Sequence, residues 1–190
     1  SWSPDGSQIA ICSDQDGRFD TYLISLQSGT IRKVLDQPCP DWVVHWSPDG
    51  EHLVVVSEAE GQDYRTTLVP LDGSEALVIK KDGLVINAKG SHWSPDGHKV
   101  VFSSNVSGAY QIGIFDLATH KLTWLTDDDG EKESPRYSPD GRQIVYVLSH
   151  GPDSELVVHS LADETRVTYQ IEPGVIYEPT FSPDGKSIFF

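Results

Sequence analysis

The densest group of reactive side chains in this sequence is an acidic run, Asp127-Asp128-Asp129, followed closely by Glu131 and Glu133. Carboxylates at this density form either a solvated loop or an anionic surface that attracts a basic partner or a cation. The solvated loop is the simpler interpretation, and attraction of a basic protein or peptide is the functional one. Asp127, Asp128 and Asp129 are therefore candidate binding residues.

A second set of candidates recurs at one position of a repeated pattern. His45 and His92 each precede a tryptophan, and Arg136 precedes Tyr137 at the corresponding place in the next repeat. If the strand that carries them is the innermost strand of its sheet, these side chains line a central channel. Polar lining of a water-filled channel is the simpler interpretation, and ligand binding in the channel is the alternative.

Motifs of familiar catalytic chemistry are missing from the sequence. It contains no Gly-x-Ser-x-Gly, P-loop, Gly-x-Gly-x-x-Gly or His-Glu-x-x-His. Cys12 and Cys39 lack the spacing of a zinc pair, and whether they form a disulfide is left open. Asp14, Asp16 and Asp20 do not follow EF-hand spacing, so a hydrated loop is preferred to a cation site there. We therefore expect no catalytic residues, no metal and no cofactor.

The elements that position the candidate residues are set by the tetrapeptide Ser-Pro-Asp-Gly. Its five copies have prolines 44, 47, 44 and 44 residues apart, and a β-rich run follows each copy. The aromatic residues that precede the copies are Trp2, Trp46, Trp93, Tyr137 and Phe181. Proline suits the second position of a type I turn, serine and aspartate bind nearby backbone amides, and glycine accepts a left-handed conformation. Each copy thus predicts a β-hairpin, in which the serine and aspartate are turn residues.

Each repeat divides into four short strands. In the second repeat these are Val43–Ser47, His52–Ser57, Arg65–Pro70 and Ala76–Lys80, and the fourth repeat opens with Pro135–Ser138. Four-stranded antiparallel sheets that recur at this period and pack face to face form a β-propeller. We predict an all-β propeller of four blades plus part of a fifth, with approximate repeats 1–42, 43–88, 89–133, 134–176 and 177–190. The aromatic residue before each turn is expected to wedge between neighbouring blades.

Composition narrows the classes of partner. The formal net charge is −15, from 14 basic and 29 acidic residues, which argues against nucleic-acid binding and against attraction to anionic membrane surfaces. No apolar run approaches the roughly 18 residues of a membrane span, so membrane insertion is not expected. The chain opens within a repeat and contains no methionine, so we interpret it as a piece of a longer polypeptide.

An aromatic residue, then Ser-Pro-Asp-Gly, then a hydrophobic strand resembles the TolB-type propeller repeat, also called PD40 or WD40-like. Ser13-Asp14-Gln15-Asp16-Gly17 and Leu125-Thr126 fit the same repeat, whereas Ser57–Tyr64 lacks the usual Asp-Gly. The resemblance covers the whole chain and is specific for the fold but not for function.

Two functions follow from the resemblance. The first is a non-catalytic module that binds a protein or peptide partner, as in TolB, with a periplasmic or extracellular location. The alternative is the accessory propeller of a prolyl-oligopeptidase-type serine peptidase, which restricts substrate access. In that case the catalytic domain lies outside this chain and the location is cytoplasmic.

The arrangement of repeats also predicts an open arc. The second strand of the repeat occurs at both ends of the chain, as Gln8–Ser13 and as Ser187–Phe190, which a self-closed ring of four blades would not need. We expect a fragment of a ring of about six to eight blades. The open blade edges would expose apolar surface and favour self-association.

Overall fold

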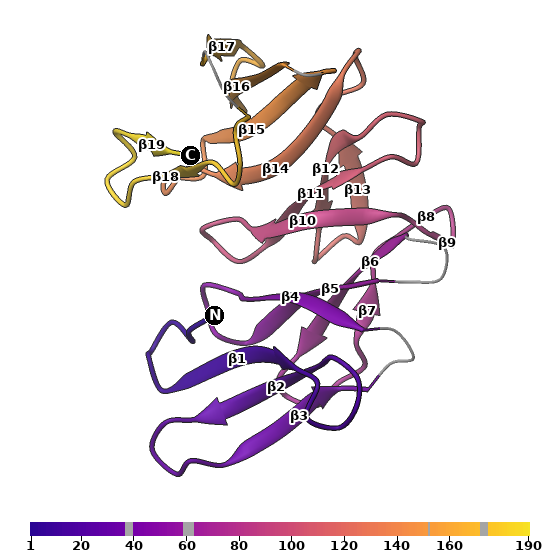
Figure 1. Cartoon of the computed structure of the whole chain (residues 1–190), viewed down its shortest axis with the longest axis vertical. Coiled ribbons are helices and arrows are strands. Elements are labelled where there is room, and N and C mark those ends of the chain that lie inside the picture. Colours follow the sequence, from indigo (N-terminus) through magenta and orange to yellow (C-terminus); the bar gives the residue numbers. More distant parts are fainter. Residues whose placement is uncertain (37–39, 59–62, 152, 172–174) are drawn as a thin grey trace. The chain divides into compact units, whose positions relative to one another are not determined.

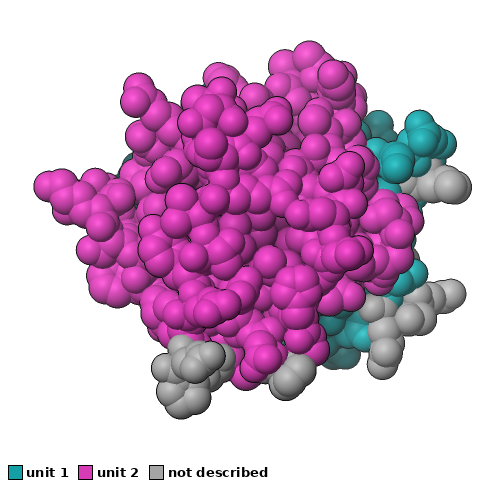
Figure 2. Space-filling view, turned by 90° about the horizontal axis from the view of Figure 1, so that it is seen from above, with its two compact units in different colours: residues 1–89 teal, residues 90–190 magenta. Residues whose placement is uncertain are grey.

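The computed structural model describes residues 1–36, 40–58, 63–151, 153–171 and 175–190 (Figure 1). These residues form two compact units, Ser1–Lys89 and Gly90–Phe190, which Figure 2 distinguishes by colour. Every strand pairing is antiparallel, and each sheet is built from strands that follow one another in the chain. Among the described residues no helix has the length and hydrophobicity needed to cross a lipid bilayer.

The described residues of the first unit form a three-stranded sheet, a four-stranded sheet and a short hairpin. The three-stranded sheet contains β1 (Gln8–Ser13), β2 (Asp20–Ser25) and β3 (Ile31–Leu35), and Trp2 adds a single bridge to Ile9 beside β1. The four-stranded sheet contains β4 (Asp41–Trp46), β5 (His52–Glu58), β6 (Tyr64–Pro70) and β7 (Leu77–Val78). The hairpin joins β8 (Lys80–Lys81) to β9 (Leu84–Val85).

The second unit contains the third, fourth and fifth repeats. Its first sheet is β10 (Ala88–Trp93), which begins at the end of the first unit, with β11 (Lys99–Ser104), β12 (Gln111–Asp116) and β13 (Lys121–Trp124). Its second sheet is β14 (Glu131–Tyr137), β15 (Gln143–His150), β16 (Asp153–Ser160) and β17 (Arg166–Gln170). A pair, β18 (Thr180–Phe181) with β19 (Ile188–Phe189), starts the fifth repeat. The prediction of four-stranded propeller blades followed by part of another is confirmed.

Two local features differ from the strands expected from sequence. β14 begins at Glu131 rather than at Pro135, because its register shifts between Glu133 and Arg136 and Ser134 there adopts φ 53°. Proline cannot donate to a sheet ladder, and a bulge is one of the places where a strand tolerates it. In the second repeat, the segment Ala76–Lys80 forms only the two-residue strand β7 before the β8–β9 hairpin begins.

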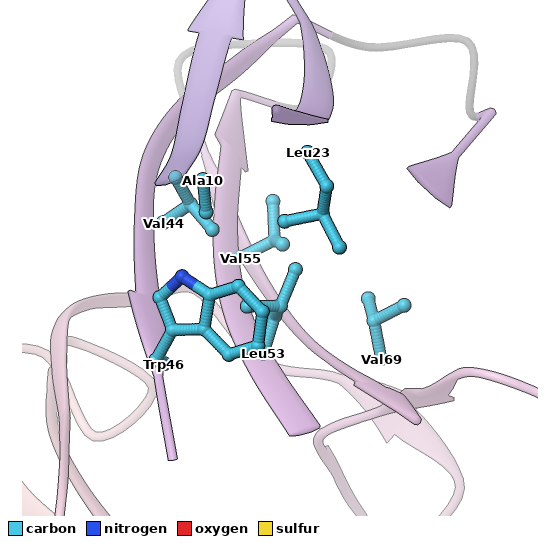
Figure 3. Packing of buried hydrophobic residues seen from close by; sticks show 7 residues of the cluster. All are labelled: Ala10, Leu23, Val44, Trp46, Leu53, Val55 and Val69. Atoms are coloured by element: carbon cyan, nitrogen blue, oxygen red, sulfur yellow. The ribbon is translucent and has the colours of Figure 1, made fainter. Parts of the chain in front are cut away.

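Apolar side chains from successive sheets pack together, as the predicted aromatic wedge requires. In the first unit, Trp46 of β4 packs with Ala10 and Leu23 of the preceding sheet and with Leu53 and Val55 of its own sheet (Figure 3). In the second unit, Tyr137 occupies the equivalent position, between residues of β11 and β12 and residues of β15 and β16. Burial of these aromatic rings stabilises the stack because apolar area is removed from water on both sides.

The five Ser-Pro-Asp-Gly turns share one set of hydrogen bonds. In the third copy, Ser94 Oγ donates to Asp96 Oδ1 (2.6 Å), and Gly97 N donates to Ser94 O (3.0 Å). His98 N donates to Asp96 Oδ1 (3.0 Å), and Lys99 N donates to Ser94 Oγ (2.9 Å). The equivalent bonds recur in the other four copies. The serine and aspartate therefore hold the turn, as their local chemistry predicts.

Candidate functional site

The acidic run Asp127–Asp129 lies in the connection from β13 to β14 and folds around a buried lysine. The side chain of Lys132 is only 1% exposed. Its ammonium donates to the carbonyl oxygens of Asp128 (2.5 Å), Asp129 (2.5 Å) and Gly130 (3.1 Å). The same nitrogen lies 3.0 Å from Asp128 Oδ1. Four oxygen atoms thus converge on one buried charge, which holds the backbone of the acidic loop in place.

The three carboxylates of this loop have different surroundings. Asp128 is paired with Lys132 and also with Arg166, whose Nη1 lies 2.5 Å from Asp128 Oδ2. Partial burial of Asp128 opposes its ionisation, but the hydrogen bonds from Lys132 and Arg166 outweigh burial and lower the pKa of this carboxyl. Asp127 and Asp129 are exposed. The loop therefore presents Asp127 and Asp129 to solvent, while the charge of Asp128 is neutralised within the fold.

Sequence reasoning identified the acidic run and missed the lysine that organises it. Comparing the repeats could have identified this lysine, because it stands where an earlier repeat has Asp41. Lys132 N donates to Tyr110 O (2.8 Å), and in the first unit Asp41 N donates to Phe19 O at the same distance. Lys132 and Asp41 therefore occupy equivalent positions, and a lysine directly after an acidic run replaces an aspartate there.

Asp41 shows how that position is used when it carries the opposite charge. Its side chain is buried and accepts hydrogen bonds from Thr21 Oγ1 (2.6 Å) and Ser57 Oγ (2.8 Å). The aspartate thereby links the sheets of the first two repeats through side-chain hydroxyls. The side chain of Lys132 instead holds the loop that precedes its own strand, through backbone carbonyls two to four residues earlier.

The second set of candidates, His45, His92 and Arg136, occupies matching places on β4, β10 and β14, one residue before the strand ends. His45 and His92 are half-buried, and His92 Nδ1 lies 3.1 Å from the carbonyl oxygen of Trp93. Arg136 is 13% exposed and forms an ion pair of 2.6 Å with Glu178. Burial lowers the pKa of Arg136, and the charge of Glu178 opposes this effect. A common channel lined by the three residues stays a prediction.

One group of described residues has the spacing of metal ligands. Asp49, Glu51 and His52 each offer a ligand atom, and these atoms lie within 4.8 Å of one another. Asp49 and Glu51 are exposed, and exposed acidic groups of this kind are common without a metal. Asp49 is also a turn residue, since its Oδ1 accepts from Ser47 Oγ and from Glu51 N. This group was not anticipated from the sequence.

The sequence left open whether Cys12 and Cys39 form a disulfide. Cys39 lies outside the described residues, so this stays open.

Comparison with known proteins places the chain in a family. The family model described as the TolB beta propeller domain, PD40, matches residues 1–126 and 58–190. The chain belongs to the PD40 family of TolB β-propeller domains. No curated protein matches the sequence.

Solved structures agree in fold with this PD40 chain. TolB from Acinetobacter baumannii superposes with a TM-score of 0.78 at 22% identity, over 98% of this chain and 46% of that one. A putative TolB from Agrobacterium tumefaciens gives a TM-score of 0.73 at 23% identity, over 88% of this chain and 62% of that one. The tricorn protease gives 0.64 at 14% identity, over 84% of this chain and 17% of that one. The chain thus spans about half the length of the TolB proteins and is a partial propeller.

Proposed function

We propose that this PD40 chain is a non-catalytic, periplasmic module that binds a basic protein or peptide through the acidic loop between β13 and β14. The observation that carries the proposal is the anchoring of this loop by Lys132, whose ammonium binds three consecutive backbone carbonyls. A binding loop that is already ordered loses little conformational freedom when a partner binds. Membership of the TolB propeller family and the net charge of −15 support the same function.

The exposed carboxylates of this loop determine which partners it binds. Asp127 and Asp129 are exposed and carry the charge that is left after Asp128 pairs with Lys132 and Arg166. Exposed charges at an interface act mainly on the association rate and on specificity, and salt screens them over about 8 Å at physiological ionic strength. Binding of a basic partner should therefore weaken as salt concentration rises.

The test uses random 12-residue peptides displayed on phage and selected on the immobilised chain at low salt. We expect the enriched peptides to be basic and their affinity to fall with added salt. The double variant Asp127→Asn, Asp129→Asn should weaken binding about fivefold, or about 1 kcal/mol. The control Glu51→Gln, Glu75→Gln removes the same charge from exposed residues of other turns and should have little effect. Neutral enriched peptides, or equal losses in the two double variants, would refute the role of this loop.

A second candidate function is the accessory propeller of a serine peptidase. The observation that favours it is the fold similarity to the tricorn protease, which is a similarity of fold alone at 14% identity. Under this alternative the propeller restricts access to a catalytic domain elsewhere in the same protein. Turnover of peptide p-nitroanilides by the purified chain, abolished by one point substitution, would contradict the non-catalytic proposal itself.

A further inference from the structure

In the second unit, a pocket of about 380 Å³ opens between the third and fourth of the chain's five Ser-Pro-Asp-Gly turns. Its polar lining includes Asp96 and Asp140, one from each turn, together with Lys99. Its apolar lining includes Ile114 and Leu161, and the ring of Tyr137 stands between the two turns. The acidic loop precedes β14 and this pocket follows it, so the two sites lie at opposite ends of that strand.

The hydroxyl group of Tyr137 is the unusual feature of this pocket. Tyr137 is 93% buried, being only 7% exposed, and within the described part of the chain its hydroxyl has no hydrogen-bond partner. Burial and the nearby charge of Asp96 both raise the pKa of this tyrosine, so the group is a neutral O–H. Buried hydroxyl groups nearly always have partners in folded proteins. This hydroxyl has almost no accessible surface, so Tyr137 shapes the pocket through its ring rather than through a hydrogen bond to a ligand.

The two carboxylates each retain an unused oxygen atom. Asp96 Oδ1 accepts from Ser94 Oγ and His98 N, and Asp140 Oδ1 accepts from Ser138 Oγ and Arg142 N. Among the described residues, neither Oδ2 accepts a hydrogen bond. The turn bonds lower the pKa of both carboxyl groups, so both are ionised over a wide pH range. Against these two negative charges the lining holds one ammonium, that of Lys99.

The equivalent place in the first unit holds a smaller pocket with a different aromatic residue. A pocket of about 170 Å³ lies there between the first and second turns, lined by Asp5, Asp49 and Trp46 among others. It has the same pair of turn aspartates, but Trp46 stands where the larger pocket has Tyr137. The bulkier indole accompanies the smaller volume. In Figure 3 the indole nitrogen of Trp46 points toward the apolar cluster of Ala10 and Val44.

From this geometry we propose that the pocket between the third and fourth turns binds the side chain of an arginine from a protein partner. Only arginine offers several N–H donors in one plane together with a flexible apolar stem. The guanidinium would donate to the free oxygens of Asp96 and Asp140. The apolar stem would lie against Ile114 and Leu161. This inference rests on the proposed function, since it supposes that the chain binds a protein.

The test is a titration of the chain with N-acetyl-arginine-N-methylamide, followed by nuclear magnetic resonance of the backbone amides. We expect saturable shifts at residues 94–99 and 137–141, with a dissociation constant on the order of 1–10 mM for this single side chain. The citrulline analogue has nearly the same shape without the charge, and it should bind at least about tenfold more weakly. Equal binding of the two probes would overturn the proposal, as would shifts confined to other residues or the absence of shifts.

Three variants locate the site. Asp140→Asn preserves the turn, because an amide oxygen can still accept both bonds, but it removes the charge and should weaken arginine binding about tenfold. Tyr137→Phe should leave arginine binding nearly unchanged, because the buried hydroxyl does not reach the ligand. The matched control is Asp184→Asn, which makes the same change in the fifth turn, whose residues do not line the pocket. A loss in the control equal to that of Asp140→Asn would show general charge attraction and overturn the proposal.

The two proposals fail separately. If basic peptides bind and are weakened by changes at Asp127 and Asp129, but the arginine probe does not bind, only the pocket is refuted. If the probe binds in the pocket and no peptide depends on the acidic loop, the acidic-loop proposal fails while the arginine site stands.

Discussion

Replacing Lys132 with methionine tests whether this buried ammonium organises the acidic loop. Methionine has nearly the same length and volume but cannot donate, so the substitution changes charge and hydrogen bonding with little change in packing. In the native fold the ammonium lies 2.5 Å from each of two carbonyl oxygens, 3.1 Å from a third and 3.0 Å from Asp128 Oδ1. All four interactions are lost at once in Lys132→Met.

The size of the effect follows from two opposing contributions. A hydrogen bond to a charged group contributes about 1.5–3 kcal/mol to stability, and a buried partner left unsatisfied costs about 1–3 kcal/mol. The loss is partly offset because methionine removes the cost of burying an ammonium, and because water reaches an exposed loop. Gln111 Nε2 also continues to donate to Asp128 O (2.8 Å). We therefore expect the free energy of unfolding to fall by about 2–3 kcal/mol.

The matched variant is Asp128→Asn. The Asp128 side chain is 51% exposed, and exposed ion pairs contribute about 0–1 kcal/mol, so this change should cost less than about 1 kcal/mol. Urea unfolding followed by circular dichroism gives both values, provided the dependence on urea concentration is unchanged between variants. If Lys132→Met is neutral, or if Asp128→Asn costs as much, the carbonyl oxygens are not what the lysine stabilises.

Three further outcomes follow from the structure. Gly113→Ala should cost about 1–3 kcal/mol, measured by thermal unfolding, because a Cβ atom there would lie 2.7 Å from Phe102 Cζ. Gly141→Ala should cost about 1–2 kcal/mol, since φ is +71°, a left-handed conformation that residues with a Cβ atom rarely adopt. The buried ring of His159 has no hydrogen-bond partner among the described residues, and burial lowers its pKa. The unfolded chain therefore binds a proton at this histidine more readily than the folded chain does. The contribution of the neutral histidine to the free energy of unfolding is fully present above about pH 6.5. It falls as the pH drops toward the folded pKa, by up to about 1.4 kcal/mol per pH unit. The unfolding free energy of His159→Phe should change less between pH 7 and pH 5, and an equal change in both proteins would contradict this assignment.

The turns and many of the strands could be predicted from sequence because their chemistry is local. All the hydrogen bonds of a Ser-Pro-Asp-Gly turn join residues at most five positions apart, so the tetrapeptide and its flanking residues are sufficient. The predicted strand Gln8–Ser13 likewise matches β1 from end to end. Repetition of these local units, with apolar runs between them, was enough to predict the propeller.

The candidate sites depended on tertiary structure, because each needs a buried group and a partner from a distant part of the chain. The acidic run is visible in the sequence, but the division between Asp128, which is paired, and its exposed neighbours requires Lys132 to be buried and Arg166 to approach from β17. The pocket beside Tyr137 likewise requires two turns 44 residues apart to face each other. Sequence determines the conformation of each turn through bonds among neighbouring residues. Only the packing of one sheet on the next decides which charges are neutralised and which hydroxyl is left without a partner.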